Sequence, residues 1–366
     1  MALNGVHGIY LVPRTGELDP VAVMLPALER APNLSVLACT VPGMSSQSGG
    51  AHDAVFRRIL GEPANAASQI RAAVPAALVD RLDLDQLSRA CGSFVDATLR
   101  WRHSDLLFTA PLDGHAAFIY VLIEHQSGAG PLMPFRMLRY VVRIWDSHLS
   151  EHPRATRLPA IIPLVVHHNR RPWAGPTNVL DLLDLDRDTT HAAQPYLPRF
   201  QFLLDDLAHL DDHALRTRPL TPPVRLTLLL LTIAAGNPHL ADDLRPWTDE
   251  LRATLQRPNG KNDFITLLTY IETVGEAPTD ELHDLFAQLG PEAEEAYMTT
   301  ADMLRAEGEA RGEARGRTEA LVQLLTLKFG PLPQSTLDTV HTATIDQLET
   351  WTTRVLTAHT LDEVLH

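Results

Sequence analysis

Two apolar runs joined by Asp-Gly restrict the fold of this chain more than any other feature of the sequence. The runs "SDLLFTAPL" (104–112) and "AAFIYVLIEH" (116–125) are each long enough for a strand. The residues between them, "DGH" (113–115), are typical of a tight turn. We therefore predict a β-hairpin over residues 104–125.

Helical and strand-like segments alternate around this hairpin. Apolar residues have helical spacing in "HDAVFRRIL" (52–60) before it and in "FRMLRYVVRIWDSHL" (135–149) after it. A further buried run, "LPAIIPLVVHH" (158–168), predicts another strand. This order predicts an α/β fold in which helices flank a mixed sheet.

One apolar stripe runs along the helix of residues 135–149: Phe135, Leu138, Val142 and Trp145.

The chain divides into four predicted parts. Residues 1–43 show no sustained periodicity and are expected to form a loosely ordered N-terminal extension. Residues 44–210 carry the α/β pattern, and residues 211–295 are helical and rich in leucine. Residues 296–366 contain a long Glu/Arg-rich helix followed by a small helical module. We expect a mainly helical C-terminal half.

The long helix carries glycines at every fourth position, Gly308, Gly312 and Gly316. In a helix each glycine costs roughly 1 kcal/mol relative to alanine. We therefore expect their shared face to pack against another helix. If that helix belongs to a second copy of the chain, the 296–329 helix would form a homo-oligomer. The module that follows is expected to pack through four apolar residues: Ile345, Leu348, Trp351 and Val355.

Charge and cysteine content limit the class of protein. The formal net charge is −14, which argues against indiscriminate coating of nucleic acid but not against a local basic site. Two cysteines provide neither a disulfide framework nor zinc-site spacing, which fits the cytoplasm. The longest apolar run, "LTLLLLTIAAG" (226–236), is far shorter than the roughly 20 residues that span a bilayer. We expect no contact with a membrane.

Two carboxylates are predicted to meet at one end of the hairpin. Asp105 begins its first strand and Glu124 ends its second, so the two residues can lie at the same edge of the sheet. Converging carboxylates repel each other unless a cation or a shared proton lies between them. Oxygen ligands suit Mg²⁺, with Mn²⁺ and Ca²⁺ as alternatives, rather than zinc. The backbone carbonyl of His125 can turn toward the ion, and Gln126 is on the same face as Glu124.

Simpler roles exist for both carboxylates. Asp105 can cap a strand turn, and Glu124 can pair with Arg136 or Arg139.

The pair His167-His168 ends the strand of 158–168, and without a third ligand it is better explained as a strand terminus than as a zinc site.

A basic block directly follows Glu124. Residues 134–174 hold seven arginines but only two acidic residues, a net charge of +5. A solvated helix face would explain this block, but its position next to the paired carboxylates favours binding of phosphates without sequence readout. The arginines predicted to contact DNA are Arg136, Arg139, Arg143, Arg170 and Arg171.

The Asp, hairpin and Glu-x-Gln arrangement resembles the PD-(D/E)XK nuclease signature, with Gln126 in the place of its lysine. More specifically, "AHDAVFRRIL", "SFVDATLRWRHSDLLF", "IYVLIEHQS", "MPFRMLRYVVRIW", "LVVHHNRRPW" and "PRFQFLLDDL" occur in an order similar to that of the recombination-promoting nuclease (Rpn) family, which includes YhgA-like transposases. The resemblance covers roughly residues 51–366 and is most specific at "SDLLF" and "IEHQS".

The resemblance implies a restriction-endonuclease-like fold and a role for each site residue. Asp105 and Glu124 would be metal ligands, and Gln126 would complete the catalytic set. His52 and Asp53 would be adjacent to the site on resemblance alone. A neutral glutamine can only hydrogen-bond, whereas lysine also supplies charge, so this departure makes slow turnover or altered metal preference plausible.

We therefore predict a metal-dependent DNA endonuclease of low sequence selectivity, linked to recombination or mobile elements. One alternative is an inactive family member that binds DNA or a partner; the presence of Asp105, Glu124 and Gln126 speaks against it. A second alternative, a transposase with an Asp-Asp-Glu triad, lacks a third carboxylate on a suitably placed strand or helix.

Overall fold

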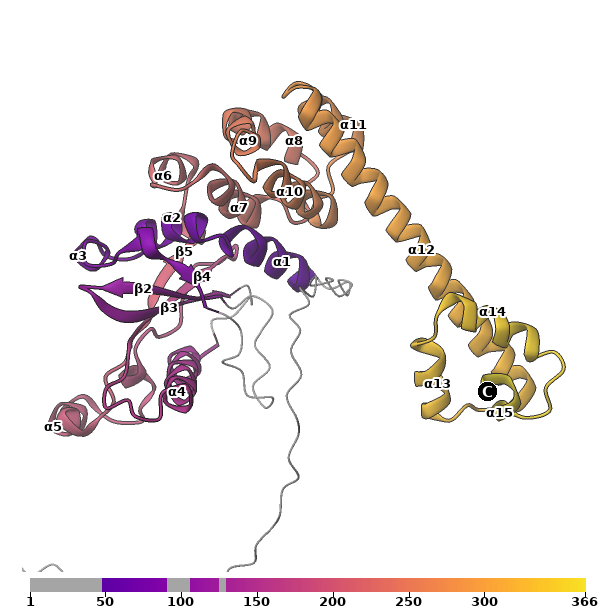
Figure 1. Ribbon diagram of the computed structural model, residues 1–366, viewed down its shortest axis with the longest axis horizontal. Coiled ribbons are helices and arrows are strands. Elements are labelled where there is room, and N and C mark those ends of the chain that lie inside the picture. The colour runs from indigo at the N-terminus through magenta and orange to yellow at the C-terminus, as the bar shows by residue number, and fades with distance from the viewer. Residues whose placement is uncertain (1–47, 91–105, 125–129) are drawn as a thin grey trace, which may run out of the picture. The chain divides into compact units, whose positions relative to one another are not determined.

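A computed structural model describes residues 48–90, 106–124 and 130–366, with only the backbone at residues 48, 49 and 122–124. The predicted extension of residues 1–43 lies outside these ranges. The fold is α/β, as the sequence predicts: a mixed sheet with flanking helices is followed by a mainly helical part (Figure 1).

The described sheet has five strands in the order β1-β2-β3-β4-β5. Their bounds are Ser88–Arg89, Leu106–Leu112, His115–Glu124, Ala160–His167 and Leu203–Asp206. β1, β2 and β3 are antiparallel, whereas β3, β4 and β5 are parallel. The predicted hairpin is confirmed, with a two-residue turn in which Asp113 (φ 49°) and Gly114 (φ 78°) are both left-handed. Such a turn twists with the strands that it joins, and glycine enters it without strain.

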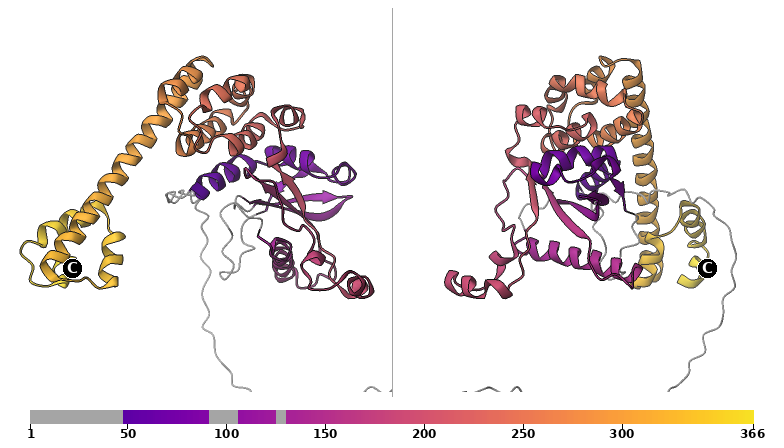
Figure 2. Two further views of the ribbon diagram at one scale, coloured as in Figure 1. Left: turned by 180° about the vertical axis from the view of Figure 1, so that it is seen from behind. Right: turned by 60° about the vertical axis from the view of Figure 1, so that its left-hand side comes forward.

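Helices cover both faces of this sheet (Figures 1 and 2). α1 (Ser48–Leu60) and α2 (Pro63–Ala73) pack on one face, and α4 (Met133–Glu151) packs on the other. Side chains alternate between the faces along each strand. Phe108 and Val166 therefore belong to the core under α1, while Leu107, Tyr120 and Val165 belong to the core under α4.

The predicted apolar stripe of α4 is not its buried face. Phe135 and Val142 are 50% and 43% exposed, whereas Met137, Tyr140 and Ile144 are buried against the sheet. Apolar residues cover two adjoining faces of this helix, and periodicity alone cannot tell which of them meets the sheet. The side that we predicted to be the apolar stripe is mostly solvent-facing among the described residues.

The helical part that follows shares its core with the sheet. Its helices are α6 (Asp212–Thr217), α7 (Pro222–Ile233), α8 (Leu240–Leu244), α9 (Thr248–Leu255), α10 (Gly260–Val274) and α11 (Thr279–Ala287). One hydrophobic cluster runs from Phe56 of α1 and Ile119 of β3 to Leu229 of α7 and Phe264 of α10. The domain boundary that we placed between residues 210 and 211 stays a prediction.

A buried ion pair fixes β5 to the start of the helical part. Arg218 donates to Asp205 at 2.7 Å, and Gln69 of α2 donates to the same carboxylate oxygen at 2.5 Å. Arg218 and Asp205 have side chains only 12% and 10% exposed. A charge buried this deeply is stable only with such partners.

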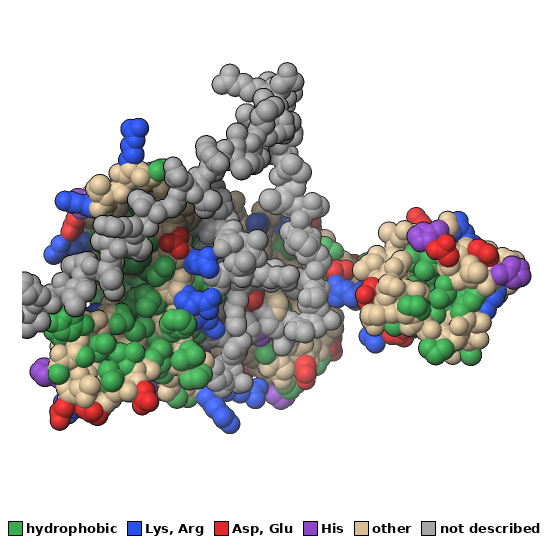
Figure 3. Space-filling view, turned by 90° about the horizontal axis from the view of Figure 1, so that it is seen from below, with side chains coloured by type: hydrophobic (Ala, Val, Ile, Leu, Met, Phe, Trp, Pro, Cys, Tyr) green, Lys and Arg blue, Asp and Glu red, His purple; other side chains and the backbone are tan. Residues whose placement is uncertain are grey.

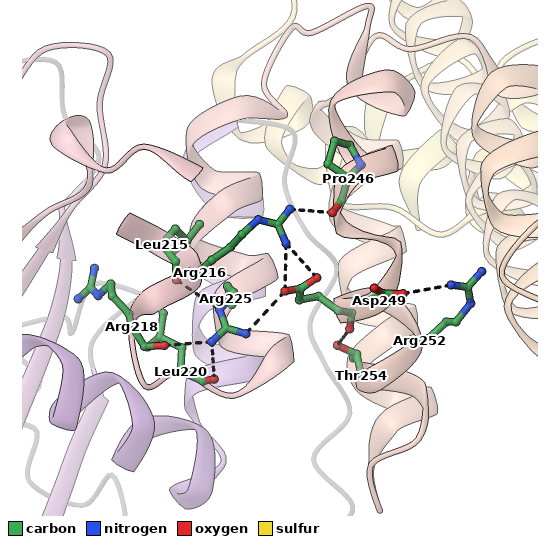
Figure 4. Close-up of polar contacts among 10 residues, drawn as sticks. Leu215, Arg216, Arg218, Leu220, Arg225, Pro246, Asp249, Arg252 and Thr254 are labelled. Atoms are coloured by element: carbon green, nitrogen blue, oxygen red, sulfur yellow. Dashed lines mark hydrogen bonds and ion pairs between the residues drawn. The ribbon is translucent and has the colours of Figure 1, made fainter. Parts of the chain in front are cut away.

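A second arginine cluster joins α6, α7 and α9 (Figure 4). Arg216 donates to Glu250 at 3.3 Å and to the Pro246 carbonyl at 2.7 Å. Arg225 donates to the carbonyls of Arg218 (3.0 Å) and Leu220 (3.2 Å) and lies 3.9 Å from Glu250. These contacts satisfy the backbone of the loop between α6 and α7, which carries Arg218.

The long predicted helix is confirmed as α12 (Pro291–Phe329), and a helical module follows it. The module contains α13 (Gln334–His341), α14 (Ile345–Arg354) and α15 (Leu361–Leu365). Leu348, Trp351 and Val355 are buried in its core, as predicted, whereas Ile345 is only half-buried.

The middle of α12 is exposed on all sides among the described residues. Ion pairs between its successive turns, such as Glu307–Arg311 and Glu313–Arg317, stabilise it in solvent. A Cβ added at Gly308, Gly312 or Gly316 would meet no described atom within 4 Å. The helix that we expected against this face is therefore absent from the described part of the chain.

Short elements complete the described fold. They are α3 (Ala76–Val79), α5 (Arg187–Ala193), η1 (Leu84–Gln86), η2 (Val179–Leu182), η3 (Gln194–Tyr196), η4 (Leu207–His209) and η5 (Arg245–Trp247). No helix in the described ranges combines the length and apolar character needed to cross a bilayer.

Replacing Gly308, Gly312 and Gly316 together by alanine should stabilise α12. Each added Cβ meets open space, so each change should gain about 0.5–1 kcal/mol of helix stability. Hydrogen exchange of the α12 amides measures this gain. Gly236→Ala is the control, because its φ of +65° makes alanine strained and destabilising. Faster exchange in the triple variant, with loss of an oligomer in light scattering, would show instead that this face packs against a second copy.

Candidate active site

The parallel half of the sheet brings three strand ends together. Glu124 ends β3, His167 ends β4 and Asp206 ends β5, and these residues are in register across the sheet. β2 begins at Leu106, which pairs with Val121, so the start of β2 lies near the end of β3 at Glu124. We call the line from Glu124 through His167 to Asp206 the carboxyl edge.

On the α4 side of the carboxyl edge, Asp206 holds the His167 ring. His167 Nδ1 donates to Asp206 Oδ1 at 2.8 Å, because a carboxylate has only acceptor atoms. The backbone N–H of Trp173 donates to Oδ2 at 2.8 Å, and the Trp173 ring meets the imidazole edge-on at 5.2 Å between centroids. The His167 side chain is only 3% exposed. A carboxylate that orients a histidine in this way is a common second layer of metal and catalytic sites.

Asp206 stays ionised more readily than an ordinary aspartate. Burial by itself would raise the pKa of Asp206, but the hydrogen bonds from His167 and from the Trp173 and Ala208 N–H groups outweigh it and lower the pKa. The negative charge that orients His167 is therefore present over the whole neutral range.

On the α1 side, His168 lies against His52. The two rings are 4.9 Å apart between centroids and meet edge to face. His52 Nδ1 is 2.6 Å from the hydroxyl of Tyr270 on α10. The three residues are buried, and they join the carboxyl edge to helix α1 and to the helical part.

The predicted DNA-binding arginines come from two segments that adjoin β4. Arg139 on α4 is exposed, as are Arg170 and Arg171 after β4, whereas Arg136 and Arg143 are half-buried. The Arg139 guanidinium lies 6.0 Å from the centroid of the Phe135 ring. The molecule viewed from below shows Lys and Arg side chains beside a broad hydrophobic area (Figure 3).

Most of the predicted metal site lies outside the described residues. Asp105, His125 and Gln126 are not described, and Glu124 is described only as the last residue of β3. His52 and Asp53 lie on α1, and the His52–His168 contact places His52 beside the residue that follows β4. The described ranges alone contain no group of three or more His, Cys, Asp or Glu side chains that could hold a metal.

Sequence reasoning missed Asp206 and Tyr270. The segment "QFLLDD" (201–206) does contain a signal for Asp206: like "VLIE" (121–124), it is a short apolar run that ends in an acidic residue. Its four-residue strand is too short for a period of two to be recognised. Nothing in the sequence near Tyr270 points to a residue more than two hundred positions earlier.

The chain matches the family described as "Putative transposase, YhgA-like" over residues 50–262, which include every described element of the carboxyl edge. The chain belongs to this family. No solved structure matches it.

Named relatives of this YhgA-like protein include nucleases and inactive proteins. Recombination-promoting nuclease RpnA of Escherichia coli K12 is 31% identical over 269 residues, which cover 72% of this chain and 86% of that one. Recombination-promoting nuclease RpnD of Escherichia coli O157:H7 is 32% identical over 69% and 93% of the two chains. A protein named as inactive, RpnE of Escherichia coli K12, is 29% identical over 76% and 89%. The resemblance to the Rpn family is thereby confirmed.

Asp206→Asn should destabilise the protein at neutral pH by about 1.5–3 kcal/mol, the usual range for a hydrogen bond to a buried charge. The pKa of Asp206 is lowered by folding, so its carboxylate stabilises the fold above the unfolded-state pKa near 4. This contribution is lost as the pH falls through the folded-state pKa, so the stability of parent and variant should converge in acid.

Urea unfolding between pH 3 and pH 7 measures this difference. The control is Asp211→Asn, because Asp211 is an exposed N-cap and asparagine caps a helix equally well. A difference of the same size at pH 3 and pH 7 would contradict the ionic role of Asp206.

Proposed function

We propose that this YhgA-like protein is a metal-dependent DNA endonuclease of low sequence selectivity that acts in DNA recombination. One observation carries the proposal: Glu124, the last residue of β3, is in register with His167 and Asp206. The start of β2, which directly follows Asp105 in the sequence, lies near the same end of β3. The names of RpnA and RpnD support the same activity.

We propose Asp105 and Glu124 as ligands of a divalent cation, Mg²⁺ first and Mn²⁺ or Ca²⁺ as alternatives. Their carboxylate oxygens, with the His125 carbonyl, are the donors that these ions prefer. When bound, such an ion lowers the pKa of a coordinated water and stabilises negative charge on a phosphate. The described residues support this proposal through the in-register edge, where the two residues that follow Glu124 across the sheet are His167 and Asp206.

The chain's own residues supply orientation and charge. Asp206 fixes the His167 ring at the middle of the carboxyl edge. In this proposal Gln126 positions the attacking water or a phosphate oxygen by hydrogen bonds, in the place of the lysine of the PD-(D/E)XK signature. Without that cation the developing charge is stabilised less, so we expect slow turnover.

DNA binding has to rest on a local patch, because the net charge of −14 repels DNA at long range. The exposed arginines Arg139, Arg170 and Arg171 are the main candidates for contacts with phosphates, and half-buried Arg136 and Arg143 contribute less. The expected compartment is the cytoplasm, since the two cysteines fit no disulfide framework.

An inactive DNA- or partner-binding protein is the second candidate, favoured by the relative named inactive, RpnE. The presence of Asp105, Glu124 and Gln126 in this chain argues for an active enzyme. Plasmid cleavage distinguishes the two.

Asp105→Ala and Glu124→Ala should each abolish plasmid nicking in Mg²⁺, because each removes a proposed ligand. Thermal stability without metal should be unchanged or higher, since two converging carboxylates repel each other. Glu151→Gln, a neutralisation of an exposed glutamate at the end of α4, is the control and should cleave normally. Full activity in either alanine variant would disprove the assignment of that residue.

Exchanging Arg139 and Arg171 for glutamine should flatten the salt dependence of DNA binding. Each lost phosphate contact reduces the log–log slope by roughly 0.9, so the pair should reduce it by about 2. Affinity for unrelated sequences should fall equally. The charge-matched control is Arg305→Gln with Arg354→Gln, two exposed arginines outside the family match. If both double variants have the parental slope, the DNA-binding surface lies elsewhere.

A further inference from the structure

Two arginines lie close together where helix α1 ends beside the strand β1. Arg57 belongs to the last turn of α1, and Arg89 is the second residue of β1, an edge strand of the described sheet. Arg89 pairs with Phe108 of β2, whose side chain lies in the core under α1. Paired residues of antiparallel strands share a face, so the Arg89 side chain also projects on the α1 side.

Gly61 lets the Arg89 guanidinium come close to the end of α1. The Gly61 N–H donates to the Arg57 carbonyl at 3.0 Å, which places this glycine directly after the last helical turn. A Cβ at position 61 would lie only 2.9 Å from Arg89 Nη1 and would also meet the Arg57 carbonyl. The absence of a side chain at Gly61 therefore leaves the room that Arg89 occupies beside Arg57.

Neither arginine has a partner in the part of the chain that the structure describes. No hydrogen bond or ion pair joins Arg57 or Arg89 to another described residue, and even the buried Nε of Arg57 has no acceptor there. Glu62, which follows Gly61, is exposed and pairs with neither of them. Buried polar groups of proteins are nearly always hydrogen-bonded, so a guanidinium held by no acceptor of its own chain is available to a ligand.

The two positive charges repel each other. Partial burial lowers the pKa of Arg89 below its ordinary value, and the charge of Arg57 lowers it further. The carbonyl groups at the end of α1 carry partial negative charge, which offsets part of this repulsion. An anion between the two side chains would offset more of it, because each guanidinium presents a fork of N–H donors to an oxyanion.

We propose that Arg57 and Arg89 form a binding site for a phosphate group on the α1 side of β1. Arginine forks match phosphate oxygens both in charge and in paired hydrogen bonds, and two forks can hold one phosphate from two sides. Inorganic phosphate, a nucleotide and a nucleic-acid backbone all offer this group. The site is distinct from the carboxyl edge, because His167 and Asp206 lie on the α4 side of the sheet.

A purely structural role would explain each arginine singly. A charged residue on an edge strand, such as Arg89, discourages pairing with another chain. A basic residue in the last turn of a helix, such as Arg57, interacts favourably with the helix dipole. Neither role requires phosphate, so the two explanations differ in one measurable property, the selective binding of phosphate.

The test titrates inorganic phosphate into the full chain by isothermal titration calorimetry at constant ionic strength. The parent should bind phosphate, and Arg57→Gln and Arg89→Gln should each bind it roughly tenfold more weakly or worse, because each loses hydrogen bonds to a charged group. The matched controls are Arg71→Gln and Arg81→Gln, two exposed arginines that already pair with aspartates. Both controls should bind phosphate as the parent does.

Thermal melting separates a lost site from a damaged fold. Removing one of two repelling charges should leave the melting temperature of both site variants unchanged or higher when phosphate is absent. Phosphate should raise the melting temperature of the parent and of the controls, because a ligand that binds only the folded chain stabilises it. The same phosphate concentration should leave the melting temperature of the site variants unchanged.

Competition identifies the source of the phosphate group. The phosphate titration of the parent is repeated with an excess of adenosine monophosphate and with an excess of a short DNA duplex. Each competitor that abolishes phosphate binding is thereby assigned to the site, and if neither does so, free phosphate is the ligand.

Two results would overturn the proposal: a parent that binds no phosphate, or site variants that bind it as tightly as the parent. Neither result depends on cleavage of DNA. Failure of the proposed nuclease activity would therefore leave this test unaffected, and failure of the phosphate site would leave the metal-dependent activity to be judged by plasmid nicking.

Discussion

The parallel register of β3, β4 and β5 is the constraint on which the rest of the structure depends. Because the three strands run the same way and end in register, Glu124, His167 and Asp206 come to one edge although 82 positions separate the first from the last. A shift of one residue would move every side chain of a strand to the other face. Such a shift would break the His167–Asp206 hydrogen bond and the Asp205–Arg218 ion pair, so these contacts oppose it.

Two adjacent aspartates show how this register serves both halves of the chain. Asp205 faces α2 and pairs with Arg218, which ties the sheet to the helical part, whereas Asp206 faces the other way and orients His167. Asp205 is buried and Asp206 is half-buried, and each carboxylate is stabilised by hydrogen-bond donors that come from a fixed direction. The same short strand therefore anchors the fold and organises the candidate site.

The long, strongly patterned elements could be predicted from sequence, and the site only in part. The hairpin, the strand ending at His167 and helix α12 follow from apolar runs, an Asp-Gly turn and helical spacing. The buried face of α4 could not be chosen, because the helix is apolar on two adjoining sides. The roles of Asp206 and Tyr270 depend on contacts with residues distant in sequence, which no local pattern encodes.

The most direct test of the account is the position of a bound ion. Crystals grown with Mn²⁺ give an anomalous signal that locates the metal without assumptions about catalysis. The account predicts a peak within direct coordination distance of the Glu124 and Asp105 carboxylates, and its loss in Glu124→Ala. A fully occupied peak elsewhere, with none at Glu124, would contradict a metal-dependent site at the carboxyl edge.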